Sequence, residues 1–263
     1  KLQWFVSGSA PLSRELAEFF HAAGMLILEG YGLTETNSLT SINQVTGYKF
    51  GTVGKALHPE LQVKIAADGE ILTKGVTNLV GYYKLPDATA EAIDPDGWFH
   101  TGDIGEIDSE GYIKITDRKK DLMKTSGGKY VAPQMIENQL KLDPIISQAV
   151  VVGDNRKYIT ALVAINLDTA KQVITDGGQT PPTDLAQLAS HPLVEQRLEA
   201  KKKEVNSKLG SWEQVKYMKV LPRELTEQDG ELTPSLKVKR KVVVDRYRDL
   251  IESMYQGKEK DKE

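Results

Sequence analysis

The chain has 263 residues, of which 40% are hydrophobic and 27% are charged. This composition is that of an ordinary globular protein, so it excludes a collagen-like, a disulfide-scaffold and a wholly disordered protein. The formal net charge of -3 gives no overall attraction toward nucleic acid or an anionic membrane. Cysteine is absent, which excludes disulfides, thiolate metal sites and a cysteine nucleophile.

The first residues predict an α/β unit. Residues 1–6 have no initiator Met and are typical of a strand in progress, so we expect the chain to begin partway through a longer protein. A helix is expected over 13–24, where Ser13 is a suitable N-cap and apolar residues recur at helical spacing. The short apolar run 25–28 then completes a strand–helix–strand unit.

The next part of the chain predicts mostly β-structure. Short strand-like segments are separated by Asp-Gly and Glu-Gly turns, and they cover residues 62–66, 70–74, 98–108 and 112–116. A charged tetrapeptide, 118–121, and the sequence Ser126-Gly127-Gly128 follow them. No core can form there, so we expect a domain boundary that separates residues 1–117 from residues 118–263.

The second domain is predicted to be a small α+β unit. Helices are expected at 133–141 and 192–209, and strands at 145–152 and 159–165. The last helix is expected to run from about residue 240 to residue 255, with one apolar face made of Val243, Tyr247, Leu250, Ile251 and Met254.

The segment from Glu29 to Thr36 is the first candidate for chemistry. It follows a predicted strand, and ligands of open α/β sheets bind beyond the carboxyl ends of strands. Thr34 and Glu35 offer oxygen donors suited to phosphate and Mg²⁺, and glycines such as Gly32 let the backbone approach a ligand. A polar loop in which Thr34 and Glu35 cap the next turn explains the same residues.

Two further segments carry charged candidates. Asp103 follows an aromatic strand and could accept both hydroxyls of a ribose, although Thr-Gly-Asp is also ordinary turn chemistry. Arg118 could likewise bind a ligand or simply face solvent, since a run of charged residues usually lies on a solvated surface. The tail segment 232–241 places positive charge at the N-terminal end of the last predicted helix, where the helix dipole is also positive. We therefore expect a bound anion there, with compensation by Asp245 and solvent as the alternative.

Five motifs, in this order, resemble the adenylate-forming acyl-CoA synthetases, the relatives of firefly luciferase and of nonribosomal-peptide adenylation domains. They are Ser7-Gly-Ser-Ala-Pro11, Tyr31-Gly-Leu-Thr-Glu-Thr36, Gly97-Trp-Phe-His-Thr-Gly-Asp103, Gly111-Tyr-Ile-Lys-Ile-Thr-Asp-Arg-Lys-Lys-Asp121 and Leu232-Thr-Pro-Ser-Leu-Lys-Val-Lys-Arg240. The tail form Leu-Thr-Pro-Ser-Leu-Lys and an expected helical insertion at about 168–209 are similar to the long-chain fatty acid branch.

The resemblance implies a fold and a reaction. The fold is the end of a large N-terminal AMP-binding domain, an α/β sheet with a small β-rich subdomain, followed by a small α+β lid domain. The reaction is that of a long-chain fatty acid–CoA ligase, which uses ATP and Mg²⁺ to make an acyl-adenylate and then transfers the acyl group to coenzyme A. The implied partners are fatty acid, ATP, coenzyme A and the missing N-terminal part of the same enzyme, without nucleic acid. The implied location is cytoplasmic, with at most peripheral membrane association.

By the same resemblance, each motif contributes residues to an ATP site. Four residues would line or lie against the adenine, and these are Gly8, Ser9, Ala10 and Tyr31. Gly32 would belong to the ATP-binding residues, Thr34 would bind phosphate, and Glu35 would hold Mg²⁺.

The remaining implied roles lie further along the chain. Asp103 and Arg118 would bind the ribose hydroxyls, and Lys120 would be the hinge between the domains. Lys237 would contact the substrate carboxylate and the α-phosphate during adenylation.

The sequence departs from the family pattern chiefly by the absence of one loop, and most of the acyl tunnel is also missing. The Ser/Thr/Gly-rich phosphate loop, which normally precedes the Tyr-Gly-Leu-Thr-Glu segment, is not found in these residues, so we expect the isolated chain to be inactive. Two other functions stay open: a non-catalytic binding or regulatory module, and an adenylating enzyme that loads a carrier protein. A docking module would not require Lys237, Glu35 and Arg118, so their presence disfavours that function. The tail, which is similar to that of the long-chain branch, disfavours carrier loading.

Overall fold

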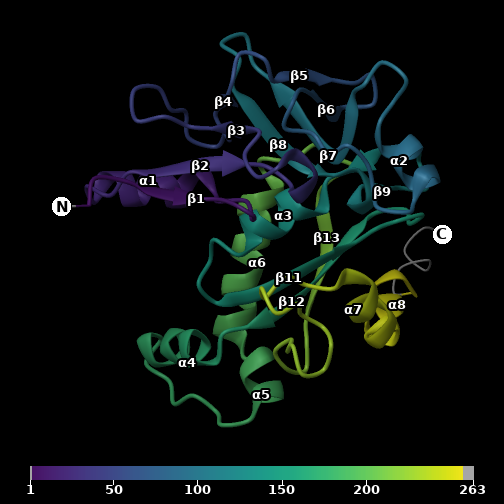
Figure 1. Ribbon diagram of the computed structural model, residues 1–263. Helices are drawn as coiled ribbons and strands as arrows, with labels where there is room; N and C mark the ends of the chain where they lie inside the picture. The colour runs from purple at the N-terminus through teal and green to yellow at the C-terminus, as the bar shows by residue number, and fades with distance from the viewer. Residues whose placement is uncertain (1, 257–263) are drawn as a thin grey trace. The chain divides into compact units, whose positions relative to one another are not determined.

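The computed structural model describes residues 2–256 (Figure 1). The chain divides into two compact units, Lys1–Asp121 and Leu122–Glu263, so the observed division falls after Asp121 and the predicted one after residue 117. Both units mix helices with sheets, which confirms the predicted mixed α/β class.

The first unit opens with the predicted strand–helix–strand arrangement. β1 (Phe5–Ser7) and β2 (Ile27–Tyr31) are parallel neighbours, and α1 (Arg14–Ala22) connects them. The Ser13 side chain accepts a hydrogen bond from the N–H of Leu16, so it caps α1 as predicted. The short strands β3 (Ser41–Ile42) and β4 (Lys55–Ala56) extend this sheet on the other side of β2. Because β1 and β2 are parallel, the loops that follow them leave the sheet at the same edge.

A second sheet of the first unit contains four antiparallel strands in chain order. They are β5 (Gln62–Ile65), β6 (Glu70–Lys74), β7 (Phe99–Ile107) and β8 (Ile113–Arg118), close to the predicted segments. Asp103 of β7 lies opposite Arg118 of β8 in the register. The unit also contains α2 (Pro86–Ala92), which has no buried residue, and two short 3-10 turns, η1 (Thr34–Thr36) and η2 (Lys119–Asp121).

The glycine-rich segment that we expected to be a domain junction is part of the second unit. Strands β9 (Met123–Lys124) and β10 (Tyr130–Val131) form a hairpin around it. Thr125 donates its N–H to the carbonyl of Lys129, and Ser126 donates its N–H to the carbonyl of Arg156. Backbone hydrogen bonds therefore bind this turn to the second unit, although the sequence places it at the junction.

The main sheet of the second unit has three strands with helices on both faces (Figure 1). The strand order is β11 (Ile146–Val152), β12 (Ile159–Ile165) and β13 (Val215–Val220). One face packs against α3 (Pro133–Leu140), α4 (Leu167–Asp176), α5 (Leu185–Ala189) and α6 (Pro192–Asn206). The opposite face packs against the C-terminal helices α7 (Arg240–Arg246) and α8 (Arg248–Tyr255). The core is therefore two apolar layers on either side of one sheet.

Two features of this unit differ from the sequence-based expectation. Strand β13 was not predicted, and the last helix is broken at Tyr247, whose backbone leaves the helical region between α7 and α8. The apolar face that the pattern predicted is nevertheless present, since Val243, Ile251 and Met254 are buried. Among the helices of residues 2–256, none combines the length and the apolar character that a membrane crossing requires.

Candidate functional site

Three residues that the sequence singled out meet in the first unit. The hydroxyl of Tyr31, at the end of β2, donates a hydrogen bond to Oδ2 of Asp103 at 2.7 Å. Nε of Arg118 lies 3.2 Å from Oδ1 of the same carboxylate. Tyr31 and Asp103 are buried, whereas Arg118 is exposed. The cluster therefore joins the two sheets of this unit and places a guanidinium at the surface.

Burial determines the protonation of Tyr31 and Asp103. Burial raises the pKa of Asp103, and the hydrogen bond from Tyr31 and the charge of Arg118 offset part of that rise. Burial, followed by the neighbouring carboxylate charge of Asp103, also raises the pKa of the Tyr31 phenol. Tyr31 therefore stays protonated and serves as a donor, which leaves the remaining lone pairs of Asp103 available to accept hydroxyl groups.

A shallow hollow of about 360 Å³ lies beside this cluster. It is lined by Thr101, Gly102, Arg118, Lys119 and Lys120, so its wall carries three cationic side chains and one hydroxyl. Such a wall is suited to an anionic or hydroxyl-rich ligand.

Glu70 organises this hollow, although the sequence analysis did not single it out. Its buried carboxylate accepts hydrogen bonds from the N–H of Gly102 at 2.9 Å and from Nζ of Lys119 at 2.9 Å, and it also contacts His100. Burial alone would raise the pKa of Glu70, but the hydrogen bonds from His100, Lys119 and Gly102 outweigh it and lower the pKa. In the sequence, Glu70 is an ordinary first residue of a strand, so no local signal marks it.

The loops after β1 and β2 depend on two glycines. A Cβ on Gly8 would lie 3.3 Å from the carbonyl oxygen of Gly30, so this loop packs directly on β2. A Cβ on Gly32 would lie 1.4 Å from the carbonyl oxygen of Ser38, a distance that no side chain tolerates. Ser9 has a φ of 65°, in the left-handed region that is costly for a residue with a side chain. Gly8, Ser9 and Ala10 are exposed.

The hydroxyl and carboxylate that we expected at a phosphate and its Mg²⁺ lie on η1. Thr34 is exposed, and Glu35 is half-buried with Oε1 accepting a hydrogen bond from the hydroxyl of Tyr82 at 3.1 Å. Within residues 2–256, no group of three or more Asp, Glu, His or Cys side chains forms a ready-made metal site. Glu35 still fits Mg²⁺, because this ion is commonly held by one carboxylate together with phosphate oxygens and water.

Glu29 is a second functional candidate that the sequence analysis did not single out as a carboxylate. It is 8% exposed, and its Oε1 accepts a hydrogen bond from the N–H of Leu12 at 3.2 Å. Burial raises the pKa of Glu29 to about 7, and the hydrogen bond from Leu12 acts in the opposite direction. Glu29 thus connects the end of the Gly8–Leu12 loop to β2.

Lys237 belongs to the second unit and is exposed on a hairpin just before α7. The N–H of Thr233 donates to the carbonyl of Lys237 at 2.8 Å, and the N–H of Lys237 donates to Oγ1 of Thr233 at 3.0 Å. Leu236, at the turn, has a φ of 59°. The position of Lys237 is therefore set by a closed turn rather than by the first turn of a helix.

The charge at the start of α7 is compensated from within the chain. Arg240 contacts both carboxylate oxygens of Glu137 and donates to the carbonyl of Val151. Asp245, the alternative we considered, pairs with Arg248 instead. Glu137 therefore supplies the negative charge that compensates Arg240, and this side chain does not need a bound anion.

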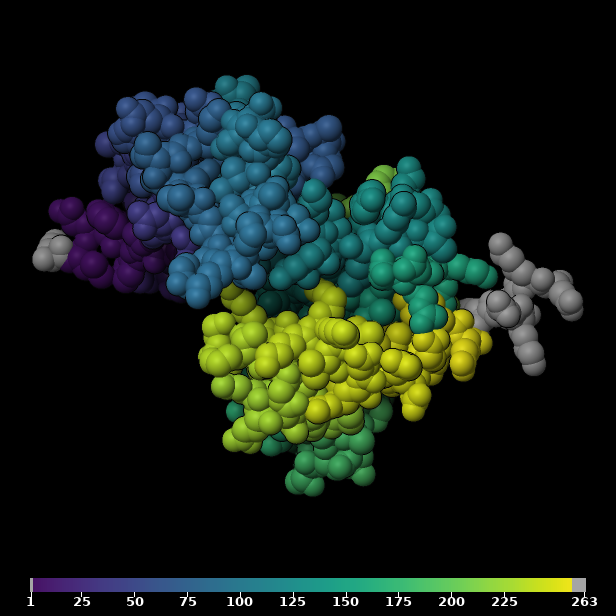
Figure 2. Space-filling model, turned by 45° about the vertical axis from the view of Figure 1, so that its right-hand side comes forward, coloured from purple at the N-terminus to yellow at the C-terminus, as the bar shows by residue number. Residues whose placement is uncertain are grey.

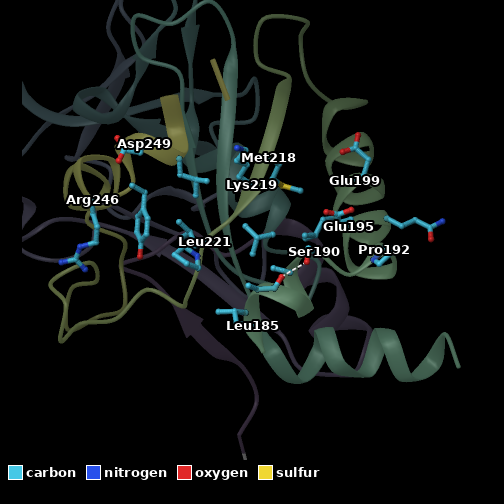
Figure 3. A pocket seen from close by; sticks show the side chains of 18 residues that line it. Leu185, Ser190, Pro192, Glu195, Glu199, Met218, Lys219, Leu221, Arg246 and Asp249 are labelled. Atoms are coloured by element: carbon cyan, nitrogen blue, oxygen red, sulfur yellow. Dashed lines mark hydrogen bonds between the residues drawn. The ribbon is translucent and has the colours of Figure 1, made fainter. Parts of the chain in front are cut away.

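Two other features complete the description of the candidates. Lys120 is exposed in η2, directly before the division between the units. The larger hollow of the second unit, about 1110 Å³, lies among α5, α6, β13 and the C-terminal helices (Figure 3). Leu185, Met218 and Leu221 are among the residues that line it, and none of the predicted site residues does.

Two family models match the chain. The model of the AMP-binding enzyme C-terminal domain matches residues 120–259, and that of the AMP-binding enzyme matches residues 1–83. Long-chain-fatty-acid–CoA ligase FadD15 of Mycobacterium bovis is 42% identical over 95% of the chain. Long-chain-fatty-acid–CoA ligase ACSBG1 of Homo sapiens is 33% identical over 95% of the chain. The chain spans 41% of the length of FadD15 and 37% of the length of ACSBG1.

Solved structures show the same fold. The adenylation domain of a carboxylic acid reductase from Segniliparus rugosus, in complex with AMP and a carboxylic acid, matches 96% of the chain with a TM-score of 0.75 and 26% identity. The O-succinylbenzoate coenzyme A synthetase of Bacillus subtilis, in complex with ATP and a magnesium ion, matches 90% of the chain with a TM-score of 0.67 and 25% identity. The chain covers 39% of the first of these structures and 45% of the second.

Proposed function

Because the chain belongs to the AMP-binding enzyme family, we propose that it is the C-terminal part of a long-chain fatty acid–CoA ligase. The complete enzyme joins a fatty acid carboxylate to the α-phosphate of ATP, which releases pyrophosphate, and the thiol of coenzyme A then displaces AMP. The names of the relatives at 42% and 33% identity support this class of substrate. A cytoplasmic location with peripheral membrane association is part of the same proposal.

The buried carboxylate of Asp103, held between Tyr31 and Arg118, is the observation that carries the proposal. In the proposed site, Asp103 and Arg118 bind the ribose hydroxyls of the nucleotide. Both groups are oriented before the ligand arrives, so binding does not require their reorganisation. The adjoining cationic wall supports a phosphorylated ligand.

The loops after β1 and β2 complete the nucleotide site in this proposal. Gly8, Ser9 and Ala10 line the adenine together with Tyr31, whose hydroxyl is already engaged by Asp103. Gly32 lets the backbone turn tightly enough for Thr34 to reach phosphate.

The remaining assigned residues stabilise negative charge on the reacting groups or allow the two units to rearrange. Glu35 would hold Mg²⁺, which neutralises charge on the phosphate oxygens when it is bound. Lys237 offsets the negative charge that builds as the carboxylate attacks the α-phosphate. Lys120 absorbs the backbone change between the adenylating and the thioester-forming arrangements of the two units.

Fatty-acid-dependent exchange between ATP and pyrophosphate tests the proposal in the complete enzyme. We expect exchange with a long-chain fatty acid and Mg²⁺, loss of most exchange in Asp103→Asn, and little change in Asp108→Asn, a carboxylate that pairs with Lys49 instead. The chain alone is expected to give no exchange. Absence of fatty-acid-dependent exchange in the complete enzyme would contradict the proposed reaction. Transfer of the acyl group to a carrier-protein thiol but not to coenzyme A would contradict the proposed acceptor.

A further inference from the structure

The buried carboxylate of Glu231 lies at the base of the hairpin that carries Lys237. Its side chain is 0% exposed. Two guanidinium groups donate to it: Arg223 contacts both oxygens at 2.8 and 3.0 Å, and Arg246 contacts Oε1 at 2.7 Å. The hydroxyl of Tyr247 and the N–H of Thr226 add donors at 3.2 and 3.1 Å. These five contacts fill the hydrogen-bonding capacity of the carboxylate, largely with charge-assisted bonds.

The donors come from different parts of the second unit. Arg223 follows β13, Arg246 belongs to α7, and Tyr247 connects α7 to α8. Arg246 and Tyr247 also line the larger hollow, and Figure 3 labels Arg246 at its edge. In Figure 2 the segments coloured from yellow-green to yellow, which include these residues and the hairpin, form one continuous surface of this unit. Glu231 therefore connects the segment after β13 with the end of α7 through hydrogen bonds to one carboxylate.

The backbone of Glu231 closes the hairpin itself. Its carbonyl accepts the N–H of Lys239 at 2.7 Å, and Leu232 pairs with Val238 in an antiparallel bridge. The next pair inward is Thr233 with Lys237, which exchange hydrogen bonds as described above. A displacement of Glu231 would therefore be transmitted through two successive pairs to Lys237.

Electrostatics favour the ionised form of this group. Burial alone would raise the pKa of Glu231, but the hydrogen bonds from Arg223, Thr226 and Arg246 outweigh it and hold the pKa below its usual range. Asp229 approaches the same two guanidinium groups, at 3.2 and 3.9 Å, but its side chain is 46% exposed and it does not close the hairpin. Asp229 therefore offers a matched control with the same charge and the same partners.

We propose that Glu231 is a positioning residue for adenylation, whose carboxylate fixes the base of the hairpin and thereby holds Lys237 at one place on the second unit. This inference rests on the adenylation role proposed above for Lys237. Glu231 does not contact the substrate in this account, and its effect on the reaction passes through Lys237.

A double-mutant cycle in the complete enzyme tests the proposal. Adenylation is measured in a single turnover from fatty acid and ATP, and thioester formation is measured from supplied acyl-adenylate and coenzyme A. Glu231→Gln should slow adenylation by roughly tenfold or more, since small misplacements of catalytic groups are costly. Thioester formation should change by less than about twofold, and Asp229→Asn should change neither step by more than about twofold.

The coupling with Lys237 is the decisive readout. In a Lys237→Ala background, Glu231→Gln should change adenylation by less than about twofold, because the group through which it acts is already gone. If Glu231→Gln slows adenylation by the same factor in both backgrounds, the positioning role is wrong. If Lys237→Ala alone leaves adenylation unchanged, the proposed role of Lys237 is wrong. The positioning role of Glu231, which depends on it, is then wrong as well.

Hydrogen exchange of the backbone separates positioning from general unfolding. In Glu231→Gln, the backbone N–H groups of residues 232–233 and 235–239 should exchange faster, while those of β12 keep the wild-type rate. Tyr247→Phe removes one donor and should produce the same changes at smaller size. Unchanged exchange in residues 232–239 of both variants would overturn the proposal.

Discussion

At Glu29, burial changes the charge that a carboxylate ordinarily carries near neutral pH. The raised pKa of about 7 means that the folded chain keeps a proton that the unfolded chain releases at about pH 4.3. A raised folded-state pKa contributes stability that is complete below the unfolded value and is lost as the pH rises through the folded value. Glu29 therefore makes the first unit less stable at pH 8 than at pH 4.

We predict that Glu29→Gln removes this pH dependence, because the amide accepts the Leu12 hydrogen bond without titrating. The free energy of unfolding of the variant, relative to wild type, should rise by on the order of 2 kcal/mol between pH 5 and pH 8. Urea unfolding at several pH values measures it, with Glu91→Gln, a change at an exposed carboxylate, as the control. A pH-independent difference between Glu29→Gln and wild type would show that Glu29 is charged in the folded chain.

Gly32 offers a second test at the scale of one residue. We predict that Gly32→Ala weakens AMP binding to the complete enzyme at least tenfold, roughly 1.4 kcal/mol, because the added Cβ collides with the backbone at Ser38. Calorimetric titration with AMP measures the effect. Gly47→Ala is the matched control, since a Cβ there meets only the Tyr112 hydroxyl, at 3.4 Å. Equal affinities of the two variants would mean that the Gly32 turn does not shape the nucleotide site.

Site residues that belong to motifs could be predicted from the sequence, whereas the buried carboxylates could not. Tyr31, Asp103 and Arg118 were named from their motifs, and the structure brings the three side chains together. Glu70 and Glu231 were not named, because their importance comes from donors that lie far away in the sequence. No local pattern distinguishes such a carboxylate from an exposed one.

At the scale of elements, the predicted helices and strands match the structure best where the hydrophobic pattern and the turn residues are clear. The strand–helix–strand unit and the four-stranded sheet have regular hydrophobic patterns and well-placed turns, so they were predicted closely. Strand β13 is short, two lysines interrupt its apolar residues, and it was missed. The break at Tyr247 was missed because the apolar pattern continues through it, while the Tyr247 hydroxyl is held by Glu231.

Brief digestion of the chain with a protease of broad specificity tests the division into units. The sequence alone suggested first cuts within residues 117–128 or 176–183. The hairpin of β9 and β10 protects the later part of the first range, so we predict first cuts near Lys119–Leu122 and in residues 176–183. Mass spectrometry of the earliest fragments locates the cuts. First cuts inside residues 112–116 or 145–152 would contradict the division.

The short turn η2 is the element on which the proposed domain motion depends. We predict that Lys120→Pro, which fixes φ near roughly -65°, slows one half-reaction of the complete enzyme about tenfold more than the other, because it favours one arrangement of the units. Lys120→Ala, which removes the side chain but keeps backbone freedom, is the control and should affect both steps little. Equal losses in both half-reactions of Lys120→Pro would point to misfolding and against a hinge.

At the scale of the whole molecule, the two units have different proposed roles. We propose that the first unit supplies the nucleotide pocket and that the second supplies Lys237 on its closed hairpin. The chain spans 41% of FadD15, so both duties are proposed for the complete enzyme rather than for the chain alone. The central claim is that Lys237 serves adenylation and has no part in thioester formation.

A pair of single-turnover measurements on Lys237→Ala in the complete enzyme tests that claim most directly. Removing a preorganised charge from the developing negative charge typically costs about 3 kcal/mol, so adenylation from fatty acid and ATP should slow about a hundredfold. Thioester formation from supplied acyl-adenylate and coenzyme A should keep its wild-type rate, and Lys241→Ala, a change at an exposed lysine of α7, should alter neither step. Undiminished adenylation, or an equal fall in both rates, would contradict the role proposed for Lys237.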